Sequence, residues 1–76
     1  GETTKKSFET IVMGQLYAGR GHITSARAYQ RNVLARARDA GETVEVEIIK
    51  SEIRSLDYII EELYRIFKAV EGRRGD

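Results

Sequence analysis

The chain has 76 residues, no Cys, no Pro and a formal net charge of +1. This length allows one small domain, whose core alone supplies only a few kcal/mol of stability. Disulfide bonds are excluded, and a structural zinc site is nearly excluded because His22 is the single histidine. No apolar run approaches the ~20 residues that a membrane span requires. We therefore expect a soluble protein, intracellular or part of a virion, that gains stability by oligomerisation.

The N-terminal half predicts one long helix from about residue 5 to about residue 40. Apolar residues from Phe8 to Ala37 stay on one side of a single helical wheel. Gly14, Gly19 and Gly21 fall within this stretch, and a glycine inside a helix costs about 1 kcal/mol relative to Ala. We therefore expect a kink near residues 19–22. The alternative is a break there, which would give three helices and a monomeric core.

A turn follows at residues 41–43. Asp39, Ala40 and Gly41 form a typical helix end, with Gly41 as the C-cap. Thr43 is the predicted N-cap of the next helix. Residues 44–48 alternate between apolar and polar like a strand, but an isolated strand would have no partner in this chain. Helix is therefore preferred for this segment.

The second predicted helix spans about residues 43–71, ends at Gly72 and leaves a polar tail at 72–76. Its apolar residues alternate steps of three and four, the a/d pattern of helices that pack lengthwise. We call this set the seam of the second helix. Its eight members are Val46, Ile49, Ile53, Leu56, Ile60, Leu63, Phe67 and Val70. The fold class is all-α, a long antiparallel helical hairpin forming one domain.

Two helices cannot enclose a core, and the second helix carries further apolar residues outside the seam. Ile59, Ile66 and Tyr64 widen its apolar surface. We therefore predict that the seam and these three residues form an assembly interface with other copies of the chain. Small residues around Gly14, Gly19 and Gly21 favour close approach of another helix.

Positive charge is concentrated in the first half, where residues 1–41 hold seven Lys or Arg and three acids. Residues 42–71 hold four Lys or Arg and eight acids. Four arginines cluster within a narrow arc of the first helix, beside its apolar face: Arg20, Arg27, Arg31 and Arg38. Arg36 points elsewhere. The cluster predicts contact with a DNA or RNA backbone, and the alternative is pairing with acids of the second helix.

Nothing in the sequence indicates an active site. His22 has no second His and no Cys to form a metal or nucleophile pair. Glu61 and Glu62 point to different sides of a helix and do not form an acid–base pair. The glycines lack the Lys-Ser/Thr ending of a phosphate-binding loop. We expect no enzyme activity, no cofactor and no small-molecule substrate.

The sequence therefore favours a non-enzymatic, self-assembling structural protein. A coat or nucleoprotein subunit of a filamentous or rod-shaped, virus-like particle would combine lateral apolar packing with an arginine-rich face for nucleic acid. The alternative is a small dimeric helical protein, either a DNA-binding regulator or a protein–protein adaptor. Sequence-specific binding distinguishes these two, because a coat does not require it.

Overall fold

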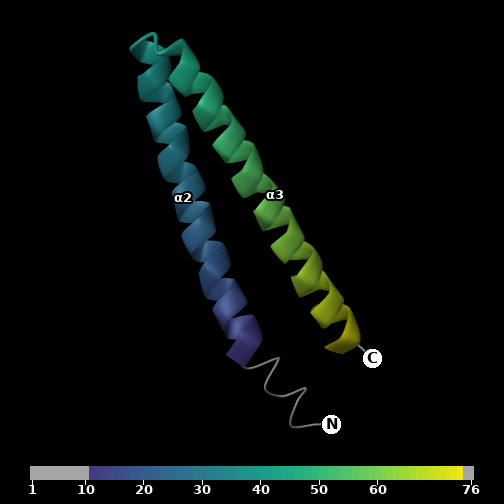
Figure 1. The fold of residues 1–76 in the computed structure, drawn as a ribbon. Helices are drawn as coiled ribbons and strands as arrows, with labels where there is room; N and C mark the ends of the chain where they lie inside the picture. Colours follow the sequence, from purple (N-terminus) through teal and green to yellow (C-terminus); the bar gives the residue numbers. More distant parts are fainter. Residues whose placement is uncertain (1–10, 75–76) are drawn as a thin grey trace.

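The computed structural model describes residues 11–74, which form two antiparallel helices joined by a tight turn (Figure 1). Helix α2 spans Met13–Asp39 and helix α3 spans Thr43–Arg74. The two helices lie side by side along a rod that measures 56 × 17 × 15 Å. The predicted all-α antiparallel hairpin is confirmed.

Helix α2 runs without a break through Gly14, Gly19 and Gly21. The single long helix is thus confirmed, and the three-helix alternative is wrong. Packing against α3 along its length outweighs the propensity cost of the glycines, since most helix stability in proteins comes from tertiary packing. Helical turns reach back to residue 11, and the predicted start near residue 5 lies outside the described residues.

The turn is built around Gly41, whose φ of 71° lies in the left-handed region that favours glycine. Its N–H donates to the carbonyl of Arg38 at 3.0 Å, and the N–H of Glu42 donates to the carbonyl of Ala37 at 3.0 Å. These two bonds form a Schellman motif, which satisfies the last carbonyls of α2. The predicted helix end at Gly41 is confirmed.

The N-cap of α3 differs by one residue from the prediction. The carbonyl of Glu42 accepts the first helical bond, from the N–H of Val46 at 2.9 Å, so Glu42 holds the N-cap position. Thr43 is the first helical residue, and its hydroxyl donates to the carbonyl of Gly41 at 3.5 Å. The Schellman turn moves the entry into α3 one residue earlier than the threonine alone suggests.

Helix α3 also ends later than predicted. It continues past residue 71 to Arg74, so part of the expected polar tail is helical. A glycine stops a helix mainly where it takes a left-handed conformation. Among the described residues, Gly41 alone does so, and Gly72 stays within the helix.

The seam of α3 faces α2, and all eight of its residues are buried or half-buried. Helix α2 presents a matching set at the same alternating steps of three and four, and each of its members is also buried or half-buried. This α2 seam consists of Met13, Leu16, Arg20, Ile23, Arg27, Gln30, Leu34 and Ala37. Two equal heptad seams therefore close the hairpin in an antiparallel coiled-coil arrangement.

The core between the seams is thin. Among the described residues, five are buried: Met13, Ala37, Ile49, Phe67 and Val70. Met13, Phe67 and Val70 form one cluster at the open end, away from the turn, and Leu16 and Leu63 pack against it. No side chain of the described part falls below 2% exposure. The hairpin therefore has the small core that the chain length implied.

We predict that replacing Gly14 or Gly21 by Ala stabilises the hairpin by about 1 kcal/mol each. A Cβ added at either position would meet nothing within 4 Å, so only the helix propensity changes. Urea unfolding followed by circular dichroism measures the effect. Gly41→Ala is the control and should destabilise by about 1 kcal/mol, because Ala is strained at a φ of 71°. A loss of stability in Gly14→Ala would contradict the prediction.

Candidate interaction surfaces

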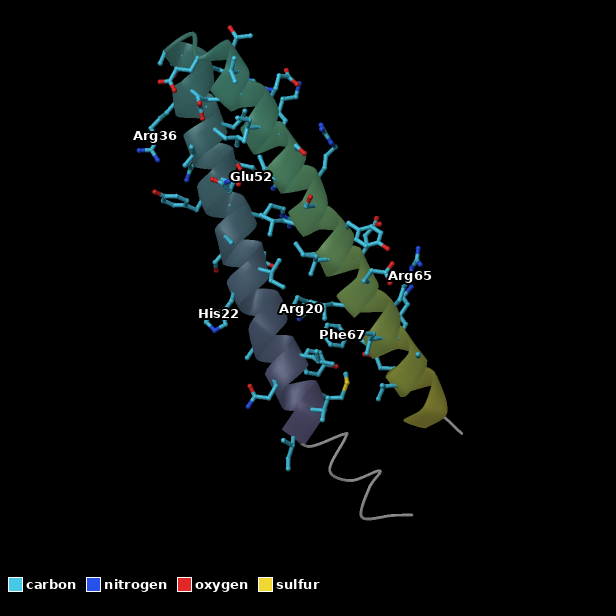
Figure 2. All side chains as sticks on the ribbon, in the orientation of Figure 1. Arg20, His22, Arg36, Glu52, Arg65 and Phe67 are labelled. Carbon is cyan, nitrogen blue, oxygen red and sulfur yellow. The ribbon has the colours of Figure 1, made fainter. Side chains whose placement is uncertain are left out.

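Two of the four arginines predicted to contact nucleic acid point into the hairpin instead. Arg20 lies on the α2 seam, with its guanidinium 5.5 Å from the ring centre of Tyr17 and 5.1 Å from that of Phe67. The two rings stack at 4.3 Å between centroids. Figure 2 shows Arg20 and Phe67 together between the helices. Cation–π contact of this kind ties α2 to α3 near the open end.

Arg27 is the second inward arginine. Its Nη1 donates to Oδ1 of Asp57 on α3 at 2.8 Å, with side chains 24% and 46% exposed. Among the described residues this is the one salt bridge that joins the two helices. The Nε of Arg27 is buried without a hydrogen-bond partner. Arg27 therefore pairs with an acid of the second helix, which was the alternative to nucleic-acid contact.

The remaining arginines of α2 point outward. Arg31 and Arg38 are exposed, and neither has a salt bridge within the described part of the chain. Arg36 is exposed too and points away from α3 (Figure 2). Residues 13–38 contain no acid, and the three outward arginines make the outer surface of α2 positive in its part near the turn.

The hairpin has two broad faces, one on each side of the groove between the helices. Tyr17 and Asp57 identify one face, because each reaches across the groove to the opposite seam, at Phe67 and Arg27. Residues at seven-residue steps from these two share that face, since seven residues are nearly two helical turns. On α2 the row continues through Arg31 and Arg38, and on α3 it includes Lys50 and Tyr64. Arg54 flanks this row, four residues after Lys50.

The opposite face is apolar in the half of the hairpin near the open end. Its α3 row contains Ile59 and Ile66, which are 42% and 40% exposed. Its α2 row, at seven-residue steps, begins at Val12, which is 41% exposed, and ends at the half-buried Val33, which lies in the half near the turn at about the level of Glu52. We call Val12, Val33, Ile59 and Ile66 the apolar face. The small residues Gly19 and Ala26 lie between the two valines.

The predicted assembly interface is thus divided among three places. The eight seam residues pack against α2 of the same chain. Ile59 and Ile66 lie exposed on the apolar face, whereas Tyr64 is exposed on the opposite face, with the Lys68 ammonium 5.4 Å from its ring centre. The positions at which a second copy could dock without unfolding the hairpin are therefore the exposed ones.

Neither a metal centre nor a membrane span is found in the part of the chain that the structure describes. No cluster of three or more His, Cys, Asp or Glu there could hold a metal ion. None of its helices is both long and apolar enough to cross a membrane. His22 is exposed and points outward from α2 (Figure 2).

Comparison with known proteins gives no match to a family model, to a curated protein or to a solved structure.

The helical wheel missed the two inward arginines because it ranked residues by polarity. It placed Arg20 and Arg27 beside the apolar face, whereas the α2 seam passes through both. One signal was available in the sequence: from Met13 to Ala37 the seam repeats the alternating steps of the α3 seam. Requiring matched seams on both helices of a hairpin would have found it. That Lys50 and Arg54 share a face with Arg31 was not predictable from the sequence, because it depends on the register between the two helices.

We predict that Asp57→Ala destabilises the hairpin by about 1 kcal/mol, because Arg27 then keeps a partly buried charge without its carboxylate. Replacing Arg27 by Met should be neutral or stabilising, since an apolar side chain suits the seam and removes the unpartnered Nε. Thermal unfolding of both variants measures the difference. Equal losses in both variants would contradict this view of the pair.

Proposed function

We propose that this chain is a non-enzymatic structural protein that assembles with copies of itself through the apolar face. In this role it would serve as a coat or nucleoprotein subunit of a filamentous or rod-shaped particle. The observation that carries the proposal is the exposure of Ile59 and Ile66, about two helical turns apart in the same row, on a hairpin with a thin core. Exposed apolar rows on small domains typically mark interaction sites.

Face-to-face packing of two hairpins would bury these side chains in a four-helix bundle. Each isoleucine is about two-fifths exposed, so completing its burial would contribute about 1 kcal/mol. Gly19 and Ala26 lie between Val12 and Val33 on the α2 row and leave room for a neighbouring side chain. A row with two small residues between two valines favours close contact with a second copy.

The same α3 row becomes acidic toward the turn, where Glu45 and Glu52 take the positions of the isoleucines. Figure 2 shows Glu52 between the helices near the turn end. Contact between the apolar halves alone would keep these like charges apart and leave both turn ends outside the contact. The resulting pair would be longer than one hairpin, which suits an elongated particle.

A dimeric DNA-binding regulator or protein–protein adaptor is the second candidate. The same apolar face supports it, because a four-helix bundle closed by two hairpins buries that face completely. The two proposals predict assemblies of different size, since a regulator stops at a discrete dimer and a coat continues to add subunits.

We predict that Ile59→Asp abolishes self-association while the hairpin stays folded, because Ile59 is exposed in the single chain. Light scattering on a sizing column gives the mass, and circular dichroism gives the helix content. Ser51→Asp is the matched control, since Ser51 is exposed on the outer side of the same helix, and it should assemble like the parent chain.

Ile60→Asp provides the opposite contrast, because Ile60 is half-buried in the seam. It should unfold the hairpin itself, at a cost of about 3 kcal/mol. A parent chain that stays monomeric at every concentration would overturn the proposal, as would an Ile59→Asp variant that still associates. A discrete dimer would favour the regulator or adaptor over the coat.

A further inference from the structure

We propose that the face opposite the apolar face binds the phosphate backbone of nucleic acid through four cations from both helices. These cations are Arg31, Arg38, Lys50 and Arg54, and we call them the basic face. This inference deepens the proposed packaging function and rests on it for its biological role. It differs from the sequence prediction by replacing Arg20 and Arg27, which are engaged within the hairpin, with two cations of α3.

The register between the helices places these cations together. The Arg27–Asp57 salt bridge and the Tyr17–Phe67 stack fix which residues of α2 and α3 lie at the same level. Four residues after Arg27, at about one turn toward the loop, α2 carries Arg31. At the corresponding level, α3 carries Lys50 and Arg54 on the same face. The register therefore places these like charges at similar levels of the two helices, in the half of the hairpin nearer the turn.

Four acids of α3 lie on this face or beside it by the same spacing, and Glu61 and Glu71 lie toward the open end, away from the four cations. Glu47 lies 3.5 Å from the Lys50 ammonium, and Asp57 is occupied by Arg27 at 2.8 Å. Arg31, Arg38 and Arg54 have no salt bridge within the described part of the chain. Like charges held close together on a rigid scaffold repel each other, and a bound polyanion relieves that repulsion.

The neighbouring side chains favour a nucleic acid over an anionic membrane. A membrane-binding surface needs large apolar side chains beside its cations. Next to the arginines of the basic face, α2 carries the small, exposed residues Ala28 and Ala35. The exposed aromatic side chains of this face, Tyr17 and Tyr64, lie toward the open end and away from these cations. Cations flanked by small side chains suit contact with the closely spaced charges of a phosphate backbone.

The same surface predicts binding without sequence preference. Base reading in the major groove relies on Asn, Gln or bidentate Arg side chains inserted among base edges. Of the two amides next to Arg31, Gln30 is half-buried in the seam and Asn32 is exposed on the outer side of α2. The basic face is formed by two helices side by side rather than by a single protruding helix that could enter the major groove. Its arginines and lysine would therefore contact phosphates and leave the bases unread.

The test measures binding of a random DNA duplex by fluorescence anisotropy across a salt series. The double variant Arg31→Gln with Arg54→Gln should bind about tenfold more weakly at moderate salt, and its slope of log affinity against log salt should fall by about two. The control is Arg36→Gln with Arg65→Gln, which removes the same formal charge from outward positions off the basic face (Figure 2), Arg65 being paired with Glu62 at 3.2 Å. The control should keep the parent slope.

Repeating the series in the Ile59→Asp background separates this inference from the proposed assembly. Binding that depends on Arg31 and Arg54, with no self-association in any variant, would support the basic face and overturn the packaging role. Assembly with equal losses of binding in both double variants would overturn the basic face alone. Absence of duplex binding by the parent chain would also overturn the basic face. The same holds if the Arg31 and Arg54 variant weakens self-association and leaves duplex binding unchanged, because the basic face would then contact another copy.

Discussion

The pairing of two equal heptad seams is the interaction on which the rest of the structure depends. Both helices present eight positions at identical alternating steps, and a single Schellman turn at Gly41 joins them in register. Once that register is fixed, every other side chain is assigned to one of two broad faces or to an outer surface. Seam pairing alone therefore places Ile59 and Ile66 on one broad face and Arg31 and Arg38 on the other.

The α2 seam is unusual in carrying Arg20, Arg27 and Gln30 among apolar residues. Burying charge in a seam costs stability unless it is compensated, and here stacked aromatic rings and Asp57 provide the compensation. Such pairs also disfavour other alignments, because a shift by one heptad would leave Arg27 without Asp57 opposite it. As in coiled coils with a polar residue at a core position, specificity of register is the role that best accounts for this arrangement.

Much of the fold was predictable because its signals are local and periodic. The α3 seam and the stop at Gly41 depend on spacing and on backbone conformation, and both are legible in the sequence. The ends of α3 were less accurate, since Gly72 can remain helical and Glu42 takes the cap through the geometry of the turn. The candidate surfaces were harder to predict, because the surroundings of Arg20 and Lys50 depend on pairing between residues far apart in the chain.

The two faces make different chemical demands, and their placement on opposite sides of a thin rod has a functional consequence. A partner bound to the apolar face would not cover Arg31 or Lys50, because the packed seams lie between the two surfaces. Proposed self-association and proposed phosphate contact would therefore be compatible in one particle, and neither would regulate the other by competition. Several hairpins packed through their apolar faces would also bring several basic faces onto one polymer. Weak contacts repeated along a strand add up through effective concentration, so a subunit with only four cations could still hold a long nucleic acid.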